Sequence, residues 1–263
     1  MEMHHGVVRR CRQNGYHLLA EPQDLTGGEL ERSVSGLLAT IRLDGVILTP
    51  PICDMAVVLQ AVEAANVPYV RISPFLYPGR TASVRMDETR AAYEMTQYLL
   101  SKGHRDIGFV MGHPEHGGTH LRYQGFMTAM RDAGLEPRAE WIKQGYFTFD
   151  SGVEVANAYF APGAARPTAI FSSNDDMAFG IMSVAQQMGI RIPDDMSIVG
   201  FDDTPGCNLI WPHLTTIHQP VQDMAYAAAD ILLSRNSDDD GEIAGMSREL
   251  PFTLIERDSV RAI

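Results

Sequence analysis

Short apolar runs alternate with longer amphipathic segments along almost the whole chain. The runs hold four or five residues bounded by glycine, proline or aspartate, a pattern typical of parallel strands that helices cover on both faces. We expect strands at Tyr16–Ala20, Gly45–Leu48, Tyr69–Ile72, Ile107–Met111, Ala169–Ser172 and Ile198–Phe201. The longer segments predict helices at Glu29–Thr40, Asp54–Ala65, Glu88–Ser101, Thr119–Ala133, Ser151–Tyr159, Asp175–Gln187 and Val221–Leu233.

The order of these elements predicts an α/β fold built on parallel sheets. Glycines such as Gly103, Gly134 and Gly189 stand between a helix and the next strand, where a left-handed residue ends a helix without a Cβ penalty. Asp175 and Ser151 stand where an N-cap oxygen would accept from the first free N–H groups of a helix. A length of 263 residues suits two domains or one large α/β domain.

The charge and the cysteines of the chain limit its partners and compartment. With 21 basic and 33 acidic residues the formal net charge is −12, so this chain is not expected to grip a phosphate backbone by itself. Cys11, Cys53 and Cys207 are widely spaced and are expected to be reduced thiols of a cytoplasmic protein. We find no apolar run of membrane-spanning length and no signal-peptide pattern at the start of the sequence.

The most informative stretch is residues 197–219, S-I-V-G-F-D-D-T-P-G-C-N-L-I-W-P-H-L-T-T-I-H-Q. It predicts a buried strand, the carboxylates Asp202 and Asp203 directly after it, and a second β-branched run at Thr215–Ile217. Ligands of open α/β sheets bind outside the carboxyl ends of the strands, so Asp202 stands where a polar ligand would be held. No nucleophile–base motif such as G-x-S-x-G or H-E-x-x-H accompanies the carboxylates, and we do not expect an enzyme.

Further motifs follow one another in a fixed order along the chain. They are D-G-V-I-L (44–48), V-P-Y-V (67–70), K-G-H-R-D-I-G-F-V-M-G (102–112), R-Y-Q-G-F (122–126), S-N-D-D-M-A-F-G (173–180), I-P-D-D-M-S-I-V-G-F-D-D (192–203) and L-T-T-I-H-Q-P (214–220). Together they resemble the effector-binding part of the LacI/GalR family of bacterial transcription regulators, from about Gly6 to Arg257. The resemblance implies a two-lobe, periplasmic-binding-protein-like fold in which helices flank a parallel sheet in each lobe.

The resemblance also implies lobes that are discontinuous in sequence. We expect lobe 1 to comprise residues 1–86 and 220–245, and lobe 2 to comprise 87–219 and 246–263, with crossings near Met86, Gln219 and Ala244. The chain begins inside a predicted helix, Met3–Asn14, which a strand and a helix-turn-helix precede in the family. We therefore expect this chain to lack the first strand and the DNA-binding head.

The function implied by the resemblance is that of a ligand-sensing domain. A small effector would bind between the lobes, and lobe closure would change operator binding by a homodimer through the absent head. The alternative is a periplasmic sugar-binding protein of an ABC importer, which shares the fold; the pattern at 197–219 and the missing signal peptide favour the regulator. No G-x-G-x-x-G follows a predicted strand, so no cofactor is expected.

Five residues are candidates for contact with the effector. Arg122 would lie in the first turn of a helix after a glycine-rich turn, where a guanidinium can donate two parallel bonds to vicinal hydroxyls or to a carboxylate. Asp202 can accept from ligand hydroxyls or a base N–H, and Asn174 offers an amide donor and acceptor between a strand and a helix. Phe147 and Gln219 match positions where family members present an aromatic ring and a further polar contact. Polar groups around an aromatic ring predict a sugar, with a purine as the alternative.

Two local features complete the prediction. His113, His116 and His120, near Glu115, have a spacing that resembles a metal site, but irregular backbone would not align them, and we expect a loop and no metal. Many family members carry an aspartate at the end of the third strand, whereas this chain reads R-I-S-P at 71–74, so Arg71 or Ser73 would take its place.

Overall fold

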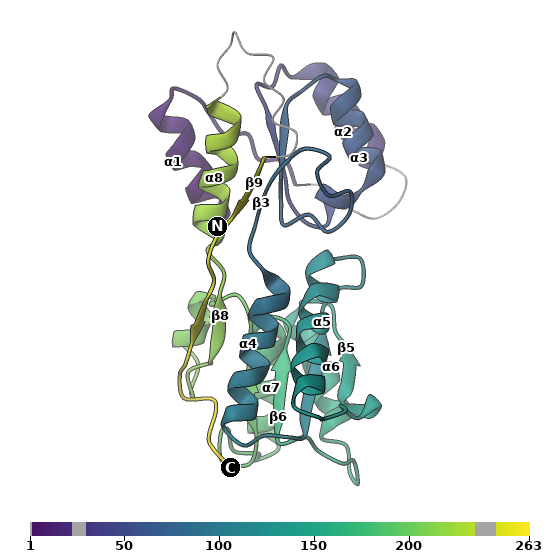
Figure 1. The fold of residues 1–263 in the computed structure, drawn as a ribbon, viewed down its shortest axis with the longest axis vertical. Helices are drawn as coiled ribbons and strands as arrows, with labels where there is room; N and C mark the ends of the chain where they lie inside the picture. Colours follow the sequence, from purple (N-terminus) through teal and green to yellow (C-terminus); the bar gives the residue numbers. More distant parts are fainter. Residues whose placement is uncertain (1, 23–29, 235–245) are drawn as a thin grey trace. The chain divides into compact units, whose positions relative to one another are not determined.

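The computed structural model describes residues 2–22, 30–234 and 246–263, and the chain divides into two compact units. The first unit comprises residues 1–86 and 220–251, and the second comprises residues 87–219 and 252–263. Both are α/β units with parallel sheets, as the sequence predicted (Figure 1). In the described residues we find no helix that is long and apolar enough to cross a membrane.

The second unit contains a four-stranded parallel sheet in the order β5-β4-β6-β7. Its strands are β4 (Ile107–Met111), β5 (Ile142–Gln144), β6 (Ala169–Ser172) and β7 (Ser197–Val199). Its helices are α4 (Glu88–Ser101), α5 (Gly117–Asp132), α6 (Phe149–Tyr159) and α7 (Asp175–Gln187). The predicted strands at 107–111 and 169–172 and the predicted helices at 88–101 and 175–187 are confirmed to the residue.

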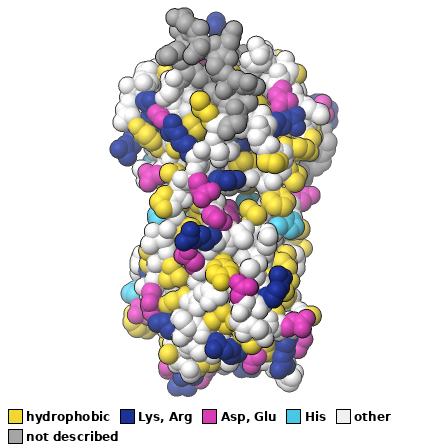
Figure 2. Space-filling model, in the orientation of Figure 1, with side chains coloured by type: hydrophobic (Ala, Val, Ile, Leu, Met, Phe, Trp, Pro, Cys, Tyr) yellow, Lys and Arg dark blue, Asp and Glu magenta, His cyan; other side chains and the backbone are white. Residues whose placement is uncertain are grey.

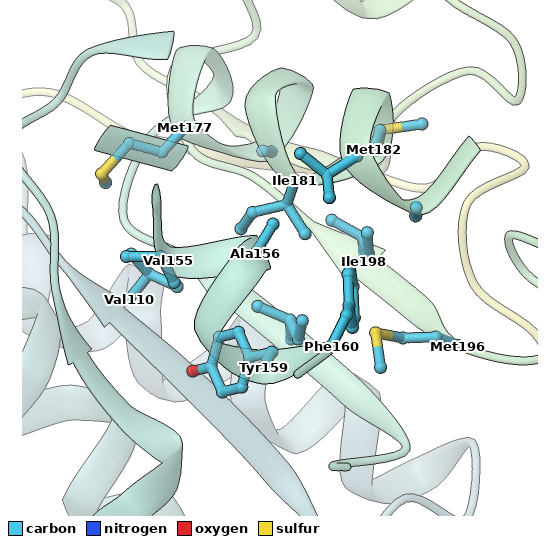
Figure 3. Close-up of a cluster of buried hydrophobic side chains, with 14 of the residues drawn as sticks. Val110, Val155, Ala156, Tyr159, Phe160, Met177, Ile181, Met182, Met196 and Ile198 are labelled. Atoms are coloured by element: carbon cyan, nitrogen blue, oxygen red, sulfur yellow. The ribbon is translucent and has the colours of Figure 1, made fainter. Parts of the chain in front are cut away.

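Alternation along the strands assigns the two faces of this sheet. Val110, Ile170 and Ile198 belong to one core cluster with residues of α6 and α7 (Figure 3). The neighbouring ring of Phe109 contacts instead the ring of Phe126 in α5, with centroids 4.8 Å apart. Helices α4 and α5 pack against each other, as do α6 and α7, so the sheet is covered on both faces, as buried parallel strands require.

Helices α4 and α5 approach closely because α5 carries a glycine at the contact. A Cβ atom on Gly125 would lie 2.1 Å from the carbonyl oxygen of Thr89 in α4, a distance that no side chain tolerates. The close approach brings the first turn of α4 to the second turn of α5. This contact determines the geometry of the site described below.

The second unit is completed by β8 (Thr216–His218) and β10 (Thr253–Ile255), which pair antiparallel. The loop between β7 and β8 contains the short 3-10 helix η3 (Pro205–Asn208). Another 3-10 helix, η2 (Ala139–Trp141), precedes β5.

The first unit contains a second four-stranded parallel sheet, in the order β1-β2-β3-β9. Its strands are β1 (Val46–Leu48), β2 (Tyr69–Ile72), β3 (Ala82–Arg85) and β9 (Ser247–Glu249). Its helices are α1 (Glu2–Gln13), α2 (Leu30–Thr40), α3 (Ala56–Ala64) and α8 (Val221–Leu233), with the 3-10 helix η1 (Ile52–Asp54). Helix α2 packs on α3 and α1 packs on α8.

Two predictions for the first unit are wrong. Tyr16–Ala20 is irregular instead of a buried strand, and Leu19 in it is 51% exposed, because no neighbouring strand pairs with its backbone in the described residues. Residues 246–251, expected in lobe 2, group with the first unit because β9 pairs with β3. The last division therefore falls between Pro251 and Phe252; the expected crossing near Ala244 lies outside the described residues.

Candidate functional site

Arg122 is a buried arginine in the second turn of α5, one turn later than predicted, because the helix already begins at Gly117. Its Nε donates to Oε2 of Glu88 at 2.6 Å, and its Nη1 donates to the carbonyl oxygen of Ser173. The guanidinium lies over the ring of Phe201, with its central carbon 3.7 Å from the ring centroid. Protein groups therefore hold this arginine in place from three sides.

The bonding of Arg122 differs from the prediction. Two of its nitrogens, Nε and Nη1, already donate to protein acceptors, so a ligand meets a guanidinium whose fork is partly occupied. Among the hydrogen bonds and ion pairs of the described residues, none uses Nη2 of Arg122. Both N–H groups of Nη2, and one N–H of Nη1, are therefore left as donors for a ligand.

Asp202 lies just beyond β7, at the carboxyl edge of the sheet, as predicted from the sequence. Its backbone has φ 127°, a conformation that residues other than glycine rarely adopt and that often marks functional sites. Its Oδ1 lies 3.8 Å from Nη1 of Arg122 and accepts from Nε2 of Gln219 at 2.5 Å. Both contacts use Oδ1, which leaves Oδ2 as the acceptor for a ligand hydroxyl or N–H.

The pKa of Asp202 is raised to about 7. The main cause is burial, and the nearby charge of Asp175 and that of Glu88 act in the same direction, while Arg122 and the bond from Gln219 lower the pKa. The side chain keeps 27% of its surface exposed, so it remains open on one side. Asp202 is therefore a carboxyl group that changes its charge near neutral pH.

Phe147 and Asn174 are joined by a hydrogen bond. Phe147 has φ 64°, and its ring lies over Gly112, where a Cβ would come within 1.9 Å of the ring carbon Cζ. Asn174 donates from Nδ2 to the carbonyl oxygen of Phe147 at 3.0 Å, and its Oδ1 accepts from the backbone N of Met177 at 3.0 Å. Asn174 thus caps α7, in place of the predicted Asp175, and supports the strained loop that carries Phe147.

The ring of Phe147 lies beside Arg122. The central guanidinium carbon is 5.7 Å from the centroid of this ring, and His116 contacts the same ring with centroids 5.1 Å apart. The structure therefore brings four of the five predicted residues together. Asp202 and Phe147 lie beside Arg122, and Gln219 bonds to Asp202. Asn174 bonds to the carbonyl oxygen of Phe147, and contact of any of the five residues with a ligand stays a prediction.

Asp175 organises the loop behind Asp202. Its carboxylate accepts from the backbone N of Thr204 at 2.8 Å, from Sγ of Cys207 at 3.2 Å and from Oγ1 of Thr216 at 2.7 Å. Burial raises its pKa, and these donors lower it. One buried carboxylate therefore connects α7, the loop after β7 and strand β8.

The histidine-rich segment is occupied by local contacts. His116 caps α5 by accepting from the backbone N of Gly118 at 3.2 Å, and a ring nitrogen of His120 lies 2.9 Å from the carbonyl oxygen of Pro114. Over residues 2–22, 30–234 and 246–263, no group of three histidine, cysteine or acidic side chains is arranged to hold a metal ion.

Arg71 of the first unit does not face a ligand. It is wholly buried, and it donates to the carbonyl oxygens of Leu76 (2.8 Å) and Tyr77 (2.5 Å), with Asp54 at 3.7 Å. The suggestion that Arg71 replaces a family aspartate is therefore wrong for this residue, because its guanidinium fastens its own loop.

Sequence reasoning missed Glu88 and Phe201. Glu88 directly follows Asp87, the N-cap of α4, and as an acid in a first helical turn it has an ordinary local explanation. Only the tertiary structure shows that Glu88 is buried, at 4% exposure, and that it bonds to Arg122. Phe201 was predicted as a strand residue, and nothing local indicates that an arginine lies on its ring.

Comparison with known proteins shows which family the chain resembles. Residues 96–260 match the profile of the periplasmic binding protein-like domain. The HTH-type transcriptional repressor PurR of Vibrio vulnificus (strain CMCP6) is 35% identical, over 98% of this chain and 76% of that protein. Among solved structures, a complex of the transcriptional regulator CelR with cellobiose has a TM-score of 0.88 at 27% identity, covering 98% of this chain and 78% of that chain. The lac repressor dimer bound to operator and the anti-inducer ONPF has a TM-score of 0.86 at 25% identity, with 99% and 89% covered.

Proposed function

The chain belongs to the LacI/GalR family of transcriptional regulators, and on that premise we propose that its second unit binds a small polar effector at Arg122 and Asp202. One observation carries this proposal. Nη2 of Arg122 and Oδ2 of Asp202 form a donor and an acceptor with no partner among the described residues, at the carboxyl edge of a parallel sheet. The ring of Phe147, whose backbone has a positive φ, lies beside the guanidinium of Arg122.

A sugar is the effector class that we propose. Vicinal hydroxyls both donate and accept, which suits a carboxylate oxygen beside a guanidinium N–H, and an aromatic ring can stack on the C–H face of a sugar. The complex of CelR with cellobiose, at 27% identity, supports this choice. A purine is the second candidate, because one donor and one acceptor beside a ring also match the edge and face of a flat base.

We further propose that effector binding is read out as altered operator binding by a cytoplasmic homodimer. A ligand shifts a conformational equilibrium only as far as it binds one state better than another. The similarity to a lac repressor dimer in complex with operator supports this coupling. The importer-binding alternative is not favoured, since the relatives described above are transcriptional regulators.

The test is a thermal-unfolding screen against monosaccharides, disaccharides, polyols, purines and nucleosides. A ligand at about 100 times its Kd adds about 2.7 kcal/mol of stability, which raises the Tm by several degrees for a chain of this size. The shift should disappear in Asp202→Asn and Arg122→Lys, and should persist in Arg131→Gln, an exposed arginine of the same helix. A cooperatively melting sample that responds to none of these classes, or a shift that survives in both site variants, would contradict the proposal.

The same screen assigns the remaining contacts. Phe147→Leu removes the ring while keeping an apolar side chain, and Gln219→Ala removes the donor to Asp202. Each variant should weaken binding of the ligand found in the screen without preventing cooperative unfolding. Asn174→Asp keeps the cap oxygen of α7 and removes the donor to Phe147, so it separates the capping role of Asn174 from its support of the ring.

A further inference from the structure

The charges around Arg122 do not balance. Glu88 bonds to Nε at 2.6 Å and Asp202 lies 3.8 Å from Nη1, so two carboxyl groups share one guanidinium. Asp203, the residue after Asp202, does not add to this excess of negative charge, because its Oδ1 pairs with Nη2 of Arg257 at 2.6 Å. At a pH where Asp202 is ionised, the site carries a net negative charge in a buried setting, where charges are screened less than at the surface.

The side chain of Glu88 is buried and packed against helix α5. Its side chain is 4% exposed, and a Cβ on Gly118, in the first turn of α5, would lie 2.8 Å from its Oε2. The carboxylate therefore lies against the N-terminal turn of α5, where the helix dipole favours negative charge. This packing leaves Glu88 little room to swing away and release Arg122 to a ligand.

The bonds from Arg122 to Glu88 and Ser173 also restrict the binding mode that an anion prefers. Arginine recognises phosphates and carboxylates best through two parallel N–H bonds. Glu88 takes Nε, and the carbonyl oxygen of Ser173 takes Nη1, so each edge of the guanidinium has one nitrogen already bonded to the protein. A hydroxyl or a carbonyl needs only one donor, which an N–H of Nη2 provides.

We propose that Glu88 is a specificity-determining residue that restricts this site to uncharged or cationic effectors and excludes phosphorylated and carboxylate-bearing ones. The inference rests on the proposed function, since it names the chemical class that the same site accepts. Glu88 acts as a resident anion that occupies the place an effector's phosphate or carboxylate would take on Arg122.

Inorganic phosphate provides a test that needs no knowledge of the natural effector. The Tm of the unaltered chain is measured in phosphate and in sodium chloride of equal ionic strength, and no phosphate-specific shift is expected. Glu88→Gln keeps an oxygen that can accept from Nε and removes the charge, and we expect it to gain a phosphate-dependent rise of a few degrees. Glu94→Gln, on the same helix but in an exposed pair with Arg90, makes the same change of net charge and should behave like the unaltered chain.

Matched ligand pairs extend the test to effectors. Glucose and glucose 6-phosphate, ribose and ribose 5-phosphate, and hypoxanthine and inosine 5′-monophosphate are compared by titration calorimetry. In any pair whose neutral member binds, the phosphorylated member should bind at least about tenfold more weakly, and Glu88→Gln should reduce that ratio about tenfold.

Three results would overturn the inference. They are a phosphate-specific stabilisation of the unaltered chain that Arg122→Lys abolishes, a phosphorylated compound that binds the unaltered chain more tightly than its neutral partner, and an unchanged ratio in Glu88→Gln. In the first two cases the site still binds ligands at Arg122, so the proposed function stands while the inference fails. Conversely, a phosphate response confined to Glu88→Gln supports the inference even where no neutral sugar or purine binds.

Discussion

Oε2 of Glu88 lies 2.6 Å from Nε of Arg122, and each side chain is only 4% exposed. The two residues are 34 positions apart and meet because Gly125 lets α5 approach α4 closely. A buried ion pair gains net stability only when further hydrogen bonds satisfy its members, and here Ser173 and the ring of Phe201 complete the surroundings of the guanidinium. Arg122 is therefore held in position before any ligand arrives, which reduces the ordering cost of binding.

The first prediction concerns this pair. Arg122→Met should destabilise the protein by about 3–5 kcal/mol, because it leaves the Glu88 carboxylate buried without a partner. The double variant Glu88→Gln with Arg122→Met should lose clearly less than the sum of the two single losses. Urea unfolding of the three variants measures the coupling. Strictly additive losses would mean that the pair contributes no mutual stabilisation.

The second prediction concerns pH. Because the pKa of Asp202 is raised from 3.8 to about 7, the folded protein holds a proton between about pH 4 and pH 7 that the unfolded chain releases. The stability from this proton is complete below pH 4 and is lost as the pH rises through 7. Asp202→Asn mimics the protonated form and should raise the Tm by a few degrees at pH 8, corresponding to about 1–3 kcal/mol, and by little at pH 4. Thermal unfolding across this range checks the difference, and a gain that is larger at pH 4 than at pH 8 would contradict it.

The third prediction concerns the ring of Phe147. Gly112→Ala places a methyl group where the ring now lies, 1.9 Å from its Cζ, so the ring must move. Affinity for the effector found in the screen should fall up to about tenfold, in line with an aromatic contact of about 0.5–1.5 kcal/mol. Gly36→Ala, in α2, meets no atom within 4 Å and should leave affinity unchanged while stabilising the helix slightly. Equal affinity in the two variants would show that the ring does not contact the ligand.

The fourth prediction concerns Asp175. Asp175→Ala leaves the donors on Thr204, Cys207 and Thr216 without their acceptor, and it should destabilise the protein by at least about 1–3 kcal/mol. Because the loop they hold follows Asp202, ligand affinity should fall as well. Asp176→Ala, the exposed neighbour in the same helical turn, should cost well under 1 kcal/mol. Equal losses in the two variants, measured by denaturant unfolding, would argue against an organising role for Asp175.

The surface of the molecule fits the proposed role. Acidic and basic side chains are interspersed over the face shown in Figure 2, and this face has no continuous basic patch. The whole chain has a formal net charge of −12, which does not favour binding to a phosphate backbone.

Local sequence patterns determined much of the fold. Buried parallel strands read as short apolar runs, and helix caps and glycine ends are chemical signals within a few residues, which is why β2, β4, β6, α4 and α7 were predicted at their observed bounds. The same patterns placed Asp202 at the carboxyl edge of a strand. Tyr16–Ala20 shows the limit of such patterns, because an apolar run becomes a strand only where a neighbouring strand pairs with it.

Only the tertiary structure decided how the site works. The strand pattern predicted Asp202 at the carboxyl edge of the sheet, and the family resemblance added Arg122 and Phe147 to the same group. The pairing of Glu88 with Arg122 depends on how closely two helices pack, and the positive φ of Asp202 and Phe147 depends on loops that distant residues hold in place. Such contacts join residues far apart in the chain, and no local pattern encodes them. The sequence by itself therefore predicted which residues a ligand would contact, and only the fold decided which of their atoms are already bonded within the protein.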